Sequence, residues 1–335
     1  MDAIAAAQVL SEIGYLLRQN PEERFRAKAF SAAAWSLAIE RPDLEALHRS
    51  SELTTLEGVG PGIAKVLAEV VETGQSRYLD RLREQMQQPA RDDESTLDFA
   101  RYQGDIHSHT KWSDGKATML EMARGAEAMG YHYLGVTDHS PRIKVVNGLD
   151  AERLLAQSRE MADVQAQVPG VVLLQGIEVD ILEDGALDLP DMVLELLDVV
   201  IASPHVKLRQ EPAAMTERML RAVSHPHVDV IGHPTGRRPG SREGASYDFE
   251  AVFKEAARNH VALELDCDPA RMDLSPEMAR LALELGCNFF MDADAHAPAE
   301  FAYVPMGMWM AMRAGIRQER ILNFLPPDQL TDVLR

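Results

Sequence analysis

The stretch Asp105-Ile106-His107-Ser108-His109-Thr110-Lys111-Trp112-Ser113-Asp114-Gly115 carries the first signal for both the fold and the chemistry. Side chains two residues apart point to the same face of a β-strand, so His107 and His109 can present two imidazoles to one metal ion. The following Ser113-Asp114-Gly115 predicts a turn that supplies a carboxylate. Because histidine pairs also occur on exposed strand edges, the metal interpretation depends on the rest of the chain.

Short apolar runs alternate with amphipathic helical stretches from residue 103 onward. We expect strands near 104–108, 132–137, 171–179, 198–204, 228–233, 260–266 and 287–294. Helices are expected near 117–129, 150–166, 213–222, 248–258, 275–284 and 307–314. About seven β/α repeats predict an α/β fold with a parallel sheet, and this many repeats favour a distorted seven-stranded (β/α) barrel over an open sheet.

Histidines and carboxylates recur where these predicted strands end. Six of the eleven histidines lie there, whereas hydrogen-bonded structural histidines would not favour one end of every strand. The residues are His107, His109, His139, His205, His233 and His296, together with the carboxylates of Glu178-Val179-Asp180 and Asp292-Ala293-Asp294. This clustering predicts a multinuclear metal site at one end of the barrel.

The side chains in this cluster also indicate the kind of metal. Imidazole and carboxylate ligands suit zinc, manganese or iron. The chain has only two cysteines, Cys267 and Cys287, and neither has a close cysteine or histidine at metal-binding spacing. We therefore expect neither a thiolate metal site nor a disulfide framework.

The first 88 residues predict a separate helical unit. Apolar residues at helical spacing predict helices near 3–17, 21–40, 44–47 and 64–72. Between the last two helices, Gly58, Gly60 and Gly62 form a helix-hairpin-helix pattern. The hairpin N–H groups and the positive end of the next helix can hold a DNA phosphate, and the alternative is a plain helical turn.

The charge of the chain limits its partners. The 335 residues have a formal net charge of −19 at pH 7, which argues against broad electrostatic capture of nucleic acid but allows a weak local contact. Residues 1–88 contain 10 Lys and Arg against 13 Asp and Glu, a net of −3, so −16 lies in the remainder. Because no apolar run could span a bilayer and no leader pattern opens the chain, we expect a cytoplasmic protein with no membrane partner.

Two parts of the chain resemble the two ends of one kind of enzyme. Residues 3–84 resemble the small N-terminal domain of bacterial family X DNA polymerases. The stretch Phe25-Arg26-Ala27-Lys28-Ala29-Phe30 falls where that family has its basic, aromatic second helix. Residues 102–330 resemble the PHP family, the polymerase and histidinol phosphatase domains. The motifs that carry this resemblance are Thr137-Asp138-His139-Ser140, Gly176-Ile177-Glu178-Val179-Asp180 and Gly232-His233-Pro234-Thr235-Gly236-Arg237.

The resemblance implies a domain organisation without a polymerase core. Residues 1–88 would form a helix-hairpin-helix DNA-contact domain, 89–101 a linker and 102–335 a PHP phosphoesterase domain. No acidic triad for nucleotidyl transfer can be placed between residues 85 and 100. Polymerase activity is therefore not expected.

The resemblance also implies a site for three divalent ions, of zinc, manganese or iron. One ion would take the ligands His107, His109, Glu178 and Asp294. A second would share Glu178 and add His205 and His233, and a third would take Asp114, His139 and His296. Glu178 would thus bridge the first two ions.

Such a cluster performs phosphoester hydrolysis, because water bridging divalent ions loses its proton near neutral pH. Glu178 and Asp114 would serve the catalytic centre. Arg237 is the best candidate to bind a substrate phosphate, with Lys207 and Arg209 as second choices. The favoured function is a 3′-5′ exonuclease or DNA 3′-end-processing activity of the kind used in DNA repair, acting on single-stranded DNA or a 3′ end. Two alternatives stay open: a phosphatase on a small phosphomonoester such as histidinol phosphate, and a non-catalytic DNA-binding protein.

Overall fold

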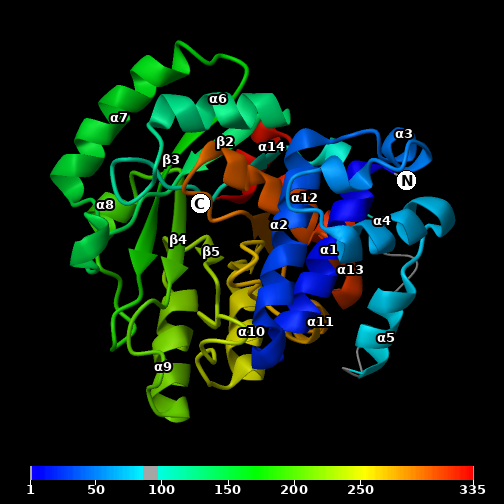
Figure 1. The fold of residues 1–335 in the computed structure, drawn as a ribbon. Coiled ribbons are helices and arrows are strands. Elements are labelled where there is room, and N and C mark those ends of the chain that lie inside the picture. Colours follow the sequence, from blue (N-terminus) through cyan, green and yellow to red (C-terminus); the bar gives the residue numbers. More distant parts are fainter. Residues whose placement is uncertain (1, 86–96, 335) are drawn as a thin grey trace.

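The computed structural model describes residues 2–85 and 97–334, which form a nearly closed barrel with a helical unit beside it (Figure 1). Seven parallel strands follow one another around the sheet in chain order. They are β1 (Gly104–Asp105), β2 (Tyr133–Val136), β3 (Val172–Asp180), β4 (Val199–Ser203), β5 (Val230–Ile231), β6 (Ala262–Asp266) and β7 (Phe289–Asp292). Beyond β1 and β7, Ser108 forms a parallel bridge with Ala295, which brings the last strand beside the first. The predicted α/β barrel is confirmed.

β3 joins the two halves of the barrel. Its first four residues pair with β2, and its last five pair with β4. Gly176 stands at this change of partner, where a Cβ would lie only 2.6 Å from the Val199 carbonyl oxygen. A glycine is therefore needed for the strands to approach one another, two residues before Glu178.

Helices cover the outside of the barrel, as the burial of both faces of a parallel sheet requires. The predicted ones are α6 (Met119–Met129), α7 (Ala151–Gln165), α9 (Pro212–Val223), α10 (Phe249–Arg258) and α11 (Pro276–Glu284). The single helix expected near 307–314 is instead two, α12 (Tyr303–Gly307) and α13 (Trp309–Ala314). The short α8 (Asp191–Leu194) and α14 (Pro327–Val333) were not predicted, because four to seven residues show too little periodicity. No helix in the described residues combines the length and apolarity needed to cross a membrane.

The helical unit consists of α1 (Ala3–Arg18), α2 (Arg24–Glu40), α3 (Leu44–Arg49), α4 (Pro61–Thr73) and α5 (Arg77–Gln85). Asp2 caps α1 by accepting a hydrogen bond from the Ala5 N–H, and Gly74 ends α4 with φ 73°. α5 was not predicted, because it is short and most of its residues are polar or charged, with Leu79 its only buried residue. Most of the predicted linker, 89–96, lies outside the described residues.

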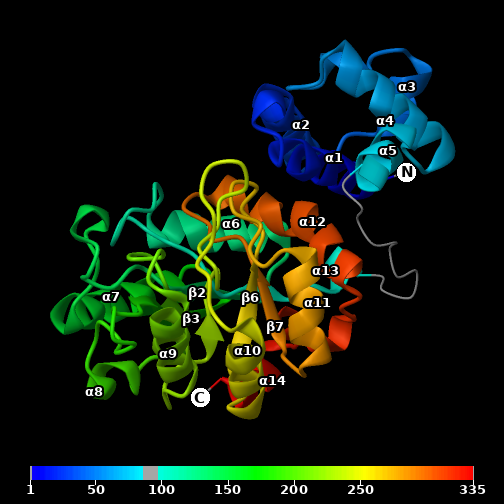
Figure 2. The ribbon, with the colours of Figure 1, turned by 90° about the horizontal axis from the view of Figure 1, so that it is seen from below.

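α1 packs the helical unit against the barrel, and Figure 2 shows it on the side that faces α12 and α13. The buried Glu12 carboxylate pairs with Arg313 of α13 and with Arg83 of α5, each at 2.7 Å. The Tyr15 ring lies against Trp309 of α13, with centroids 5.2 Å apart. The helical unit and the barrel thus share one buried carboxylate.

We predict that Glu12→Ala lowers the free energy of unfolding by about 3–5 kcal/mol, the usual effect of removing one partner from a buried ion pair. The change should appear as a lower Tm in scanning calorimetry. Glu22→Ala, at an exposed position of the same unit, is the matched control and should leave the Tm unchanged. A wild-type Tm for Glu12→Ala would show that this pair does not stabilise the contact.

Candidate metal centre

Glu178 stands at the centre of a cluster of histidines and is fully buried on β3. Its Oε1 lies 3.1 Å from His205 Nε2 and 2.8 Å from His233 Nε2. Its Oε2 lies 2.8 Å from Nδ1 of His139. These three histidines follow β4, β5 and β2, so one carboxylate lies between the ends of three other strands.

The histidines that follow β1 complete this arrangement. The Nε2 atoms of His107 and His109 each lie 3.5 Å from Glu178 Oε2. The same two atoms lie 3.5 and 3.0 Å from Asp294 Oδ1, beyond the end of β7. Closure of the barrel between β7 and β1 therefore brings this carboxylate to the first histidine pair.

A third group of side chains lies on the outer side of the cluster. Asp114 Oδ1 is 3.6 Å from His139 Nε2, 3.5 Å from His296 Nε2 and 4.0 Å from His109 Nδ1. Asp114 and His296 are partly exposed, whereas His109 is fully buried. This group therefore lies closest to solvent.

The nine predicted ligands thus lie together, in groups that overlap. Among the described residues, three sets have ligand atoms close enough to share an ion: His109, Asp114, His139 and His296; His107, His109 and Asp294; and His139, Glu178 and His205. His109 and His139 each occur in two sets, unlike in the predicted division. The assignment of each ligand to one ion stays a prediction.

The donor atoms of this cluster fit a group of metal ions. The following buried atoms have no hydrogen-bond partner within the described residues: His107 Nε2, His139 Nδ1, His205 Nε2, both ring nitrogens of His109 and His233, both Glu178 oxygens and Asp294 Oδ1. Buried polar atoms are almost always paired, so a convergent unpaired set needs another partner. Imidazole nitrogens with carboxylate oxygens suit zinc, manganese or iron, and the cluster can hold several such ions.

Two carboxylates behind the cluster orient its histidines, and the sequence analysis did not assign them this role. Glu264 on β6 lies 2.5 Å from His107 Nδ1 and accepts a hydrogen bond from the His233 backbone N–H. Asp180 lies 3.1 Å from His205 Nδ1. A carboxylate on the outer ring nitrogen fixes the nitrogen that faces the metal. A signal for Glu264 was present, since it is a charged residue between two leucines of a buried strand.

Two predicted ligands have left-handed backbone conformations, His233 with φ 24° and Asp294 with φ 48°. Such conformations cost about 1–3 kcal/mol in residues other than glycine and concentrate at functional sites. Each residue lies two positions beyond the end of its strand, where the turn brings His233 to Glu178 and Asp294 to His107 and His109.

The surrounding charges set the protonation of the histidines when no cation is bound. Burial opposes protonation of His205, but Glu178 and Asp180 raise its pKa to about 10. Burial also opposes protonation of His296, but its bond to Asp114 raises the pKa to about 9. Burial and nearby cationic groups lower the pKa of His109 and of His233 to about 3. Near neutral pH the cluster therefore combines protonated and neutral imidazoles.

A cavity of about 350 Å³ opens beside the cluster, and two arginines, Arg238 and Arg271, line it. Arg271 Nη2 lies 3.1 Å from Asp294 Oδ2. Arg237, the predicted phosphate-binding residue, does not line this cavity and instead donates hydrogen bonds to the Met272 carbonyl and the Tyr15 hydroxyl. Arg237 thus points toward α1, whereas the next residue, Arg238, lines the cavity, and the phosphate contact of Arg237 stays a prediction.

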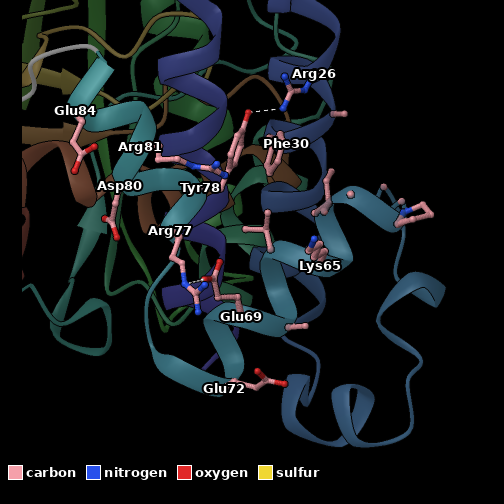
Figure 3. A pocket seen from close by; sticks show the side chains of 18 residues that line it. Arg26, Phe30, Lys65, Glu69, Glu72, Arg77, Tyr78, Asp80, Arg81 and Glu84 are labelled. Carbon is pink, nitrogen blue, oxygen red and sulfur yellow. Dashed lines mark hydrogen bonds and ion pairs between the residues drawn. The ribbon is translucent and has the colours of Figure 1, made fainter.

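The hairpin glycines lie at the start of α4, away from the metal cluster. A Cβ at Gly60 or Gly62 would meet nothing within 4 Å, so this part of the hairpin is open to solvent, and Gly58 has φ 76°. Beside it, α2, α4 and α5 enclose a groove of about 1180 Å³ (Figure 3). The groove carries both charges, as in the pair Arg77–Glu69 at 3.0 Å. The DNA contact of these glycines stays a prediction.

Comparisons with known proteins match the helical part and the barrel part of the chain to two different families. Residues 2–76 match the family model of a helix-hairpin-helix domain, and residues 105–267 match that of the PHP domain. The chain is 38% identical over 227 residues to the DNA polymerase/3′-5′ exonuclease PolX of Bacillus subtilis (strain 168). The aligned region is 68% of this chain but only 40% of that protein. It is 30% identical over 232 residues to a probable phosphatase of Thermoanaerobacter sp. (strain X514), covering 65% of this chain and 89% of that protein.

Two crystal structures show a more distant similarity. One is a histidinol phosphate phosphatase from Lactococcus lactis in complex with zinc, L-histidinol and phosphate, with 15% identity and a TM-score of 0.47 over 64% of this chain and 95% of that one. The other is a putative histidinol phosphatase from Listeria monocytogenes, with 13% identity and a TM-score of 0.47 over 59% and 97%.

We predict that metal binding releases protons and strengthens as the pH rises. His205 and His296, with pKa values of about 10 and 9, are protonated at pH 7 without metal and must lose these protons to coordinate an ion. Calorimetric titration with Zn²⁺ in two buffers of different ionisation enthalpy, between pH 6.5 and 8.5, measures both effects. His132→Ala, outside the cluster, should behave as the wild type. A pH-independent affinity without proton release would contradict the assignment of both ligands.

Proposed function

This chain belongs to the PHP family of metal-dependent phosphoesterases, and we propose that it hydrolyses phosphoester bonds at the 3′ end of DNA, as a 3′-5′ exonuclease or a 3′-end-processing enzyme. The observation that carries the proposal is the helix-hairpin-helix unit that α1 attaches to the barrel. Hydrolysis of a small metabolite needs no such unit, whereas a DNA enzyme gains from it a contact to the phosphate backbone. The similarity to a protein named as a 3′-5′ exonuclease also supports a DNA substrate.

We propose a role for each group of residues in the cluster. The nine ligands, with Glu178 at their centre and Asp114 nearest the solvent, would hold the ions. Divalent ions bound there supply a deprotonated water as nucleophile and neutralise the phosphoryl oxygens. Arg238 lines the cavity and forms no ion pair within the described residues, so its guanidinium is available to a substrate phosphate.

A phosphatase acting on a small phosphomonoester is the second candidate. A relative named as a probable phosphatase matches this chain over 89% of its own length, which supports this alternative. The cavity of about 350 Å³ also lies at the small end of the usual range for ligand sites.

A side-by-side assay separates the two candidates. The metal-loaded protein is tested on 5′-labelled single-stranded DNA, on an oligonucleotide with a 3′-phosphate, on histidinol phosphate and on p-nitrophenyl phosphate. We expect hydrolysis of the DNA substrates, and a loss of several orders of magnitude in Glu178→Gln, which removes the charge between the ligand groups. Elemental analysis should show more than one metal equivalent in the wild type and less in the variant. Sole turnover of histidinol phosphate would favour the second candidate, and no turnover would contradict both.

A pair of hairpin variants tests the proposed DNA contact in the full chain. Gly62→Glu places a carboxylate where a phosphate would approach, whereas Gly62→Ala adds only a methyl group to open space. We expect Gly62→Glu to slow DNA hydrolysis at least several-fold and to leave p-nitrophenyl phosphate hydrolysis unchanged, with Gly62→Ala near wild type on both. Equal rates of DNA hydrolysis in all three proteins would show that the hairpin does not contact the substrate.

A further inference from the structure

The outer face of α2 is exposed and carries large apolar side chains. Phe25 is 72% exposed and Trp35 is 37% exposed, although aromatic side chains of this size are usually more buried. Lys28 and Ala32 lie between them on the same face, at helical spacing, and both are exposed. We call these four residues, Phe25, Lys28, Ala32 and Trp35, the α2 strip.

α2 itself carries more positive than negative charge. Glu22 and Glu23 precede it, and Glu23 pairs with Arg26 at 2.9 Å, which leaves Arg24 and Lys28 as cations at the α2 strip. α2 contains Arg24, Arg26 and Lys28, and its first acidic residue is Glu40 at the last position. Neither Arg24 nor Lys28 forms an ion pair in the part of the chain that the structure describes. The Arg24 guanidinium lies over the Phe25 ring, 4.8 Å from its centroid. A chain with a net charge of −19 therefore presents a local surface that suits an anion.

One end of the α2 strip meets the rim of the metal cavity. Trp35 Nε1 donates a hydrogen bond of 3.3 Å to the carbonyl of Ala299, in the 3₁₀ turn η5 (Pro298–Ala302). The next residue, Glu300, lines the cavity and accepts a hydrogen bond of 2.7 Å from the His296 backbone N–H. Only η5 therefore separates the Trp35 ring from a predicted metal ligand.

The middle of α2 meets the hairpin. A Cβ at Gly58 would lie 3.3 Å from the Ala33 backbone nitrogen, so the hairpin turn packs directly on this helix. Figure 3 shows the hairpin, α4 and α2 around the neighbouring groove. The α2 strip thus runs past the hairpin, which packs beside Ala32 and Ala33, and its Trp35 end lies next to the loop that lines the cavity.

We propose that the α2 strip binds single-stranded DNA and leads its 3′ end to the metal cavity, an inference that rests on the proposed function. Bases stack on exposed aromatic rings, and neighbouring cations contact the phosphates. Phe25 and Trp35 are about 15 Å apart along the helix, at 1.5 Å per residue. Their stacking is independent of base identity, so the surface suits a strand of any sequence.

Binding measurements test this proposal without relying on hydrolysis. Fluorescence anisotropy of a 5′-labelled oligothymidylate is recorded with the full chain carrying Glu178→Gln, which keeps the oligonucleotide intact. Phe25→Ala and Trp35→Ala should each weaken binding about five-fold or more, the lower end of one base-stacking contact. Lys28→Ala should weaken it and reduce the salt dependence by about one phosphate contact. Leu196→Ala, an 81% exposed apolar residue outside the α2 strip, should have no effect.

A conservative variant separates stacking from a structural role of Trp35. Trp35→Phe keeps an aromatic ring but loses the Nε1 donor to Ala299. Under the proposal it binds DNA within about two-fold of the wild type, while Trp35→Ala does not. If Trp35→Phe is as weak as Trp35→Ala and both have a lowered Tm, the indole only joins the two units and its role in the proposal is overturned.

The outcomes distinguish this proposal from the proposed function. DNA binding that depends on the α2 strip, in a protein that hydrolyses no DNA, would retain this inference and overturn the exonuclease proposal. DNA hydrolysis with binding unaffected by Phe25→Ala and Lys28→Ala would overturn this inference alone. If the Glu178→Gln protein with an intact α2 strip does not bind the oligonucleotide, the inference is wrong.

Discussion

A carboxylate that is removed from water needs positive charge or hydrogen-bond donors around it, and Glu178 is in that position. It is fully buried, and histidines from the ends of β1, β2, β4 and β5 face its two oxygens. The pKa of Glu178 is held well below its usual range, because His205, His139 and His107 outweigh the effect of burial. The ends of β1, β2, β4 and β5 must therefore lie at the same height in the barrel for their histidines to reach Glu178. The geometry of the barrel thus sets the geometry of the site.

The second constraint is the fixed position of the helical unit. Glu12 joins α1 to α13 and α5 through buried ion pairs, and the Arg237 guanidinium joins α1 to the loops that follow β5 and β6. Those loops also carry Arg238 and Arg271, which line the cavity. The helical unit thus contacts the same loops that carry the two arginines of the cavity.

The sequence was sufficient for the barrel and for the identity of the clustered side chains, because strand ends in a parallel barrel meet at one edge. His139 and His205 could be placed from that rule alone. Glu264 was missed, because it acts from within a strand and its role depends on which rings pack above it. The direction of the Arg237 side chain could not be predicted, because it depends on tertiary contacts, here with Tyr15 and Met272. The short α5 was missed because most of its residues are polar or charged, and it is held by contacts such as Arg83 with Glu12 that the sequence does not show.

The strict chain order of the strands affects how the protein is completed during synthesis. A ribosome releases the N-terminal part first, so α1 and the His107–His109 pair leave the exit tunnel long before their partners. Asp294 and His296 arrive with the end of β7, and Arg313 follows them. Neither the metal cluster nor the contact of α1 can be finished until nearly the whole chain has been made. The face of α1 that packs on α12 and α13 is therefore covered late, whereas its face toward α2 can be buried as soon as α2 has formed.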